Sequence, residues 1–323
     1  MLAAPLLLFA VGAAQAVSID LVPVGNAGNT NDATGYGRVD QPYLIGKYEI
    51  TNAQWRDFLT AKASVSDPYG LYNTNMAGLY GGIDRRWSVD HDVYTAKGGD
   101  ANWDNRPVNY VSFWDAARFC NWLQNGQGSG DTETGAYINI GNQSTFARQS
   151  GAKYFIPTEN EWYKAAYYDP GKPGGAGYWD YPTKSNAPPI NTLLTPDPGN
   201  HANYWDYHGT GNGGYTMGGP YYSTVVGDFE NSASPYGTFD QGGNLWEWNE
   251  TAFDYSSRGM RGGDWFYRFD ALARTRYYYY DPVYEGHDVG DVGFRVASVP
   301  EPGSITLIVS GAIAGLIWWR RRR

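Results

Sequence analysis

The six residues Gly243-Asn-Leu-Trp-Glu-Trp248 carry the strongest structural signal in this chain. Large aromatic side chains are typical of a core, and Glu247 lies between two of them. One interpretation is that Trp246 and Trp248 anchor the core while Glu247 pairs with Arg261 or Arg295. That interpretation assigns the segment a structural role.

Four further stretches surround this segment: Tyr48-Glu-Ile-Thr-Asn-Ala-Gln-Trp55, Ile156-Pro-Thr-Glu-Asn-Glu-Trp162, Arg261-Gly-Gly-Asp264 and Gly293-Phe-Arg-Val296. In this order the five stretches resemble the formylglycine-generating enzyme (sulfatase-modifying factor) domain, over about Pro42 to Ser298. The resemblance implies a single α+β domain of the C-type-lectin-like sort. Such a domain has little regular secondary structure, with few helices and a small twisted sheet.

The composition agrees with this expectation. The 323 residues include 28 Tyr, 13 Trp and 42 Gly, which favours an aromatic core and many turns. The net charge of −9, with no basic cluster before the last four residues, argues against a nucleic-acid partner.

Three helix starts are predicted from capping residues. Thr51 with Gln54, Ser112 with Asp115 and Thr158 with Glu161 match the Ser/Thr-x-x-acid/amide pattern, and apolar residues at helical spacing follow each pair. Short strands are predicted near 221–226 and 293–297.

Both ends of the chain read as export signals. Residues 1–16 form an apolar stretch that closes on Ala14-Gln15-Ala16, a small-x-small cleavage pattern, although the usual basic start is missing. Residues 299–323 combine Pro-Glu-Pro, an apolar run and four arginines, which resembles a PEP-CTERM sorting tail. The resemblance implies an exosortase-type processing protease and delivery to the surface of a Gram-negative bacterium. A simple membrane anchor is the alternative. The domain then occupies residues 17–298.

Cys120 is the only cysteine of the chain and falls on the apolar face of a predicted helix. We expect it to be a small buried side chain. The founding enzymes of the family place two cysteines after their Arg-Gly-Gly-Ser motif, where they bind copper and activate oxygen. Here Asp264 replaces the serine and no cysteine follows. The resemblance therefore predicts a scaffold without thiolate chemistry, and copper is not expected.

Calcium is the cofactor that the resemblance implies. The ligands carried over are Asp240, the carbonyls of Gly243 and Leu245, and Glu247. Oxygen donors of this kind suit Ca²⁺, and alternating positions could aim them at one point. A second family site would begin at Asn203 and the carbonyl of Tyr204, but its downstream aspartate has no clear counterpart.

A related branch of the family uses non-haem iron held by a His-x-x-x-His-x-Glu motif. None of the four histidines has a partner four residues away, so iron is not supported. His201, Asp206 and His208 could converge on a metal, although packing or surface histidines are the default expectation.

The remaining candidate is an aromatic surface. Trp265, Tyr267, Tyr277 and Tyr284 lie in segments that border the substrate groove in the family, as do Tyr204 and the run 277–280. Tyrosine and tryptophan near polar groups suit carbohydrate or peptide stacking, and the alternative is inward packing of alternate rings.

These observations predict an exported, calcium-stabilised binding or structural module for polysaccharide or a surface protein. One alternative is a metal-dependent oxidoreductase of the same superfamily with a diverged site. Another is a peptide binder that assists sulfatases.

Overall fold

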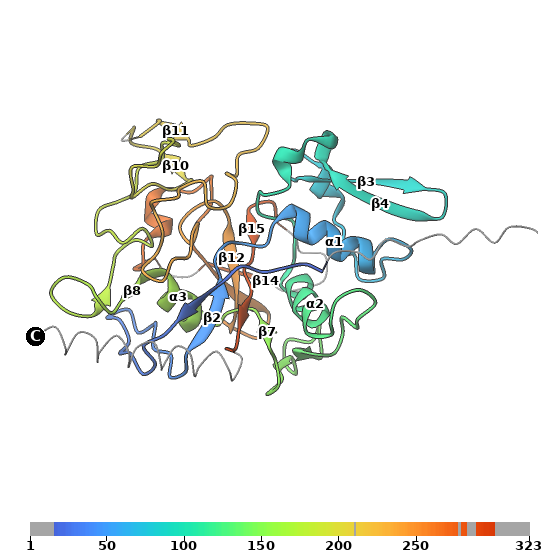
Figure 1. Cartoon of the computed structure of the whole chain (residues 1–323), viewed down its shortest axis with the longest axis horizontal. Coiled ribbons are helices and arrows are strands. Elements are labelled where there is room, and N and C mark those ends of the chain that lie inside the picture. Colours follow the sequence, from blue (N-terminus) through green and yellow to red (C-terminus); the bar gives the residue numbers. More distant parts are fainter. Residues whose placement is uncertain (1–15, 210, 277–278, 283–288, 301–323) are drawn as a thin grey trace, which may run out of the picture.

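The computed structural model describes residues 16–209, 211–276, 279–282 and 289–300, with backbone only at 279–282. Two four-stranded sheets organise the domain (Figure 1). The first has the order β1-β2-β16-β7 and is antiparallel, and the second has the order β14-β13-β12-β15, in which β12 and β15 are parallel. These sheets and three helices confirm an α+β domain with few helices.

The strands of the first sheet are β1 (Leu21–Val24), β2 (Tyr43–Gly46), β7 (Tyr154–Phe155) and β16 (Ala297–Ser298). The strands of the second are β12 (Trp246–Ala252), β13 (Ser257–Arg261), β14 (Tyr279–Pro282) and β15 (Val292–Gly293). Four two-stranded pairs complete the set: β3 (Ile83–Ser88) with β4 (His91–Ala96), β5 (Tyr137–Ile138) with β6 (Ala147–Arg148), β8 (Tyr168–Asp169) with β9 (Gly177–Tyr178), and β10 (Trp205–Asp206) with β11 (Gly214–Tyr215).

The helices are α1 (Asn52–Lys62), α2 (Phe113–Gln124) and α3 (Glu159–Tyr167). Four short 3₁₀ turns accompany them: η1 (Thr74–Ala77), η2 (Lys97–Gly99), η3 (Ala101–Trp103) and η4 (Phe269–Leu272). The β3–β4 hairpin projects from the body beside α1, and the β10–β11 pair lies at the opposite upper corner of the view (Figure 1).

All three predicted helix starts are confirmed. Thr51 Oγ1 accepts a hydrogen bond from Gln54 N at 3.3 Å, while Gln54 Oε1 accepts one from Thr51 N at 2.9 Å. Ser112 with Asp115 and Thr158 with Glu161 form the same reciprocal box. Each box satisfies backbone donors that the first helical turn leaves unpaired.

The core is aromatic, as the composition predicts. The Trp55 ring of α1 stacks on Phe119 of α2 with centroids 5.6 Å apart, and Phe294 closes the cluster at 5.6 Å from Phe119. Cys120 is fully buried in α2, and desolvation raises the pKa of its thiol. The expectation of a small buried side chain at Cys120 is confirmed.

The structure differs from the predicted strand at residues 221–226. Residues 221–226 form turns instead of the predicted strand, because Ser223 N bonds to Tyr221 O within the segment. No helix among the described residues is long and apolar enough to cross a membrane. Residues 1–15 and the apolar run of the tail lie outside the described part of the chain.

Candidate functional site

A tight turn after β13, at Gly262 and Gly263, positions the side chains of the candidate site. Gly262 and Gly263 have φ values of 104° and 73°, a region that side chains other than glycine rarely adopt. A Cβ atom at Gly263 would lie 2.9 Å from the Cβ of Ala271. The turn therefore needs both glycines, and it places Asp264 and Trp265 beneath the surface.

Asp264 is fully buried at the end of this turn. Its Oδ1 accepts hydrogen bonds from Phe266 N at 2.9 Å and Tyr267 N at 2.7 Å. Its Oδ2 has no hydrogen-bond partner among the described residues, and the Asp291 carboxyl group lies near enough to act on Asp264. A second carboxyl group nearby disfavours the ionised form of the first.

The pKa of Asp264 is accordingly raised well above its usual range. Desolvation is the main cause, and the neighbouring Asp291 adds to it. Asp264 therefore keeps its proton to a higher pH than an exposed aspartate does.

Trp265 is buried, so the prediction that it belongs to an exposed aromatic surface is wrong. Its side chain is only 5% exposed, because Tyr80, Tyr222 and Tyr215 surround the ring at centroid distances of 4.9, 5.0 and 5.9 Å. Tyr204 is also buried, with its hydroxyl donating to Pro189 O at 2.7 Å.

Other aromatic side chains near Trp265 reach solvent. Trp205 of β10 stacks on its cross-strand partner Tyr215 of β11 with centroids 5.6 Å apart, and Phe266 lies 5.4 Å from Trp205. Phe266 is 46% exposed and Tyr207 is 69% exposed. A hydrogen bond from Trp205 N to Tyr267 O at 2.9 Å ties β10 to the turn that follows β13.

These rings border an open cleft of about 270 Å³, which we call the aromatic cleft. Its lining consists of Trp205, Tyr207, Phe266, Tyr267, Arg268, Asp270, Ala271 and Arg276. Asp270 Oδ1 lies 3.7 Å from Arg268 Nε, and Asp270 Oδ2 lies 3.4 Å from Arg276 Nη1. Charged groups therefore form the rim of an apolar surface. The arrangement can stack a planar or pyranose face and hydrogen-bond its substituents.

The predicted groove residues thus have mixed outcomes. Tyr267 lines the aromatic cleft, Trp265 lies beneath it, and Tyr277 and Tyr284 fall outside the described residues. Sequence reasoning missed Trp205, Tyr207 and Phe266. Trp205 and Tyr207 alternate within 201–208, a pattern that could have indicated a shared strand face.

The histidines of that stretch do not meet. Buried His201 Nδ1 contacts Gly199 O at 2.8 Å, whereas His208 Nε2 contacts Arg268 Nη2 at 3.2 Å. Asp206 accepts backbone N–H groups, including Gly211 N at 2.6 Å. Within the described ranges no three His, Cys, Asp or Glu side chains are placed to hold a metal ion. The suggested convergence of His201, Asp206 and His208 is therefore wrong.

The Gly243–Trp248 segment is built around an ion pair. Glu247 accepts hydrogen bonds from Arg295 Nε and Nη2, both at 2.6 Å, and from Trp162 Nε1 at 2.8 Å. Arg261 instead pairs with Glu159. Of the two partners considered for Glu247, the structure selects Arg295.

The predicted calcium donors are only partly available. Both oxygens of Glu247 are occupied by the arginine, and the Tyr204 carbonyl accepts from Asn191 Nδ2 and Thr216 Oγ1, both at 3.1 Å. Asn203 Oδ1, in contrast, is buried and has no hydrogen-bond partner among the described residues. An orphaned amide oxygen of this kind fits a cation ligand.

Asp240 is the other available donor. It accepts Gly227 N at 2.6 Å, and desolvation raises the pKa of its carboxyl group to about 7, although Gly227 and Arg295 oppose the shift. A neighbouring cation would reverse this penalty. Asp240 of the first predicted site and Asn203 of the second thus remain available as Ca²⁺ ligands, whereas Glu247 is already paired with Arg295.

Comparison with known proteins places the chain in context. Residues 15–299 match the family described as "Sulfatase-modifying factor enzyme 1-like domain". The formylglycine-generating enzyme of Thermomonospora curvata is 28% identical over 214 residues, which cover 64% of this chain. The match spans 59% of that enzyme, less than two thirds of its length.

Three solved structures share the overall arrangement at low identity. CarF is 18% identical with a TM-score of 0.48, over 88% of this chain and 99% of that one. Treponema denticola variable protein 1 is 20% identical with a TM-score of 0.49, over 89% of this chain and 98% of that one. PvdO from Pseudomonas aeruginosa is 14% identical with a TM-score of 0.46, over 87% of this chain and 92% of that one. Similarity at this level carries no argument about function.

Proposed function

Because the chain belongs to the sulfatase-modifying factor enzyme 1-like domain family, we propose that it uses this scaffold as a binding module for extracellular polysaccharide, without the oxidase chemistry of the founding enzymes. The observation that carries the proposal is the aromatic cleft. Its exposed rings Tyr207 and Phe266 stand beside Asp270 and two arginines. Rings that stack a sugar face next to charged hydrogen-bonding groups are typical of carbohydrate sites.

The absence of oxidase chemistry rests on the side chains at the turn after β13. The only cysteine is Cys120, which is buried in α2 and whose pKa is raised by desolvation. The position after the Arg-Gly-Gly motif holds Asp264, paired with Asp291. Carboxyl groups are hard oxygen donors and do not replace the soft thiolates that Cu(I) requires.

Calcium is part of this proposal as a structural ion. Asp240 would supply an oxygen at the predicted Gly243–Glu247 site and Asn203 one at the second predicted site, while Glu247 would remain the partner of Arg295. The ion would stabilise the irregular backbone that carries the Gly243–Trp248 segment, since a ligand bound only to the folded state raises stability.

Export to the cell surface completes the proposal. The predicted cleavage after Ala16 would leave Val17 as the first residue, and Val17 is buried with its N–H donating to Gln127 Oε1 at 2.7 Å. The tail at residues 299–323 would direct the protein to an exosortase-type protease and to the surface.

The experiment is affinity electrophoresis of the purified domain in gels that contain extracellular polysaccharide. We expect retardation of the wild type and loss of retardation in Tyr207→Ala and Phe266→Ala. Tyr255 is 90% exposed and does not line the cleft, so Tyr255→Ala is the matched control for removal of a surface ring. Equal retardation of the cleft variants and the control would refute the proposal.

A further inference from the structure

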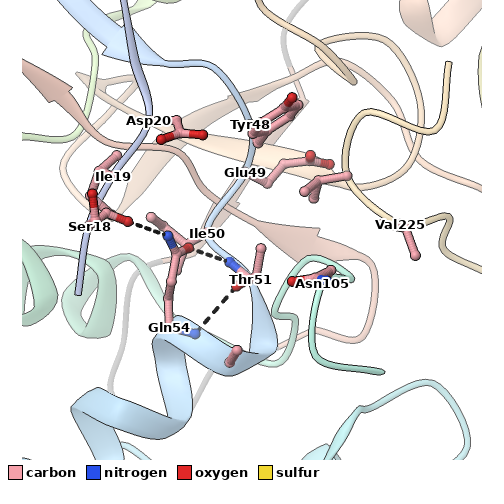
Figure 2. A pocket seen from close by; sticks show the side chains of 12 residues that line it. Ser18, Ile19, Asp20, Tyr48, Glu49, Ile50, Thr51, Gln54, Asn105 and Val225 are labelled. Carbon is pink, nitrogen blue, oxygen red and sulfur yellow. Dashed lines mark hydrogen bonds between the residues drawn. The ribbon is translucent and has the colours of Figure 1, made fainter. Parts of the chain in front are cut away.

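A second cavity lies away from the aromatic cleft and shares no lining residue with it. Its volume is about 410 Å³, and its walls come from the entry to β1, the Tyr48–Gln54 segment and the loop at Val225 (Figure 2). Cavities of a few hundred Å³ suit small organic ligands, whereas one water needs far less room.

The unusual member of this cavity is Glu49. The residue is only 2% exposed, and its Oε1 accepts a hydrogen bond from Asn244 Nδ2 at 3.0 Å. Its Oε2 has no hydrogen-bond partner among the described residues. In Figure 2 the carboxyl group points to the side of the segment on which Val225 lies. A buried carboxyl oxygen without a donor is costly, so the site calls for a donor from a ligand.

The charge of the cavity favours a cation. Asp20 is the second acid in its lining, and no lysine, arginine or histidine of the described chain lines it. Burial, Asp240 and Glu247 raise the pKa of Glu49 well above its usual range, and a cation beside the carboxyl group would oppose that shift. The nearby Arg295 is already paired with Glu247. A positive ligand would therefore meet no competing side-chain cation within the cavity.

For a metal ion, the described lining of this cavity offers two acids, Glu49 and Asp20, and no histidine or cysteine. The walls carry hydroxyl and amide groups instead, and these are fixed in place. Gln54 Nε2 donates to Ser18 O at 2.9 Å, and Gln54 also completes the capping box with Thr51 (Figure 2). Such walls suit the hydroxyl groups of an organic molecule.

We propose that this cavity binds a small hydroxylated compound with a primary ammonium group, and that the ammonium donates to Glu49 Oε2. A charge-assisted bond of this kind satisfies the orphaned oxygen and is stronger than a neutral one. The remaining polar lining then positions the hydroxyl groups. The inference does not rest on the polysaccharide proposal.

The test compares D-glucosamine with D-glucose by isothermal titration calorimetry, because the two probes differ only in the amine. We expect wild-type protein to bind glucosamine and to bind glucose at least tenfold more weakly. Glu49→Gln keeps an acceptor for Asn244 but removes the charge, so it should lose glucosamine affinity at least tenfold. Asp20→Asn, at an exposed acid of the same cavity, is the matched control and should change affinity less than threefold.

A second variant covers the case in which Glu49→Gln does not fold. Ala53 lines the cavity from the first turn of α1, and Ala53→Leu should fill the space and abolish binding without touching Glu49. Tyr255→Ala removes an exposed ring that lines neither cavity and should bind glucosamine like the wild type. Equal affinity for both sugars, unchanged affinity in Glu49→Gln, or binding of calcium alone that is lost in Glu49→Gln would each overturn the assignment.

Discussion

Glu247 and Arg295 form a two-point ion pair in which both side chains are completely buried. Arg295 Nη1 also donates to Gly46 O at 2.9 Å. Glu247 belongs to β12 and Gly46 to β2, so one arginine joins the two four-stranded sheets. The pair therefore gives the Gly243–Trp248 segment a structural role that does not depend on a metal.

Removal of one partner from this pair should be strongly destabilising. Glu247→Ala leaves a buried guanidinium without its counter-charge, and we expect a loss of about 3–5 kcal/mol in the free energy of unfolding. Urea denaturation followed by tryptophan fluorescence measures it. Arg38→Ala, which breaks the exposed pair with Asp40, is the control and should cost at most about 1 kcal/mol. Similar losses in the two variants would contradict a large contribution of the buried pair to stability.

The Asp264–Asp291 pair predicts how stability depends on pH. The folded state holds a proton on Asp264 that the unfolded chain releases above its ordinary pKa of about 3.9. Stability from this site is thus fully present at low pH and is lost as pH rises toward the raised pKa of the folded state. Asp264→Asn mimics the protonated group and should flatten this part of the profile.

Thermal melts across the pH range check this prediction. Asp264→Asn should melt higher than the wild type at mildly alkaline pH and approach it in acid. Asp254→Asn, at an exposed acid whose pKa is lowered mainly by Ser257, is the control and should lack this alkaline gain. Parallel profiles for wild type and Asp264→Asn would contradict the raised pKa of Asp264.

Chelation should reveal the structural calcium. Excess EDTA should lower the melting temperature of the wild type, because a ligand at 100 times its Kd contributes about 2.7 kcal/mol to the folded state. Asp240→Asn weakens one donor and should reduce this response, whereas Asp254→Asn should respond like the wild type. A melting temperature that does not change with EDTA in any of the three proteins would contradict the proposed structural calcium.

Local sequence features predicted local structure well. The capping boxes at Thr51, Ser112 and Thr158 are visible in the sequence because both partners lie within four residues. The sequence could not decide between Arg261 and Arg295 as the partner of Glu247. Strand β12 lies beside both β13 and β15, and the sequence does not reveal toward which neighbour the Glu247 side chain points.

The site was harder to predict for the same reason. Trp265 is buried by Tyr80, which comes from a loop 185 positions earlier in the chain, so its exposure cannot be inferred from neighbouring residues. The orphaned oxygen of Glu49 depends on Asn244 and on the walls of a cavity built from distant segments. Recurring motifs indicated the scaffold, but the contacts that define its surfaces are long-range.

The most direct test of the account is a mass-spectrometric assay for aldehyde on a Cys-x-Pro-x-Arg peptide. The purified protein is incubated with the peptide, copper, a thiol reductant and oxygen, and an active formylglycine-generating enzyme serves as the positive control. We predict that the peptide mass stays unchanged with this protein, because Asp264 and its neighbours provide no thiolate pair. Oxygen-dependent conversion of the cysteine to an aldehyde would contradict the account.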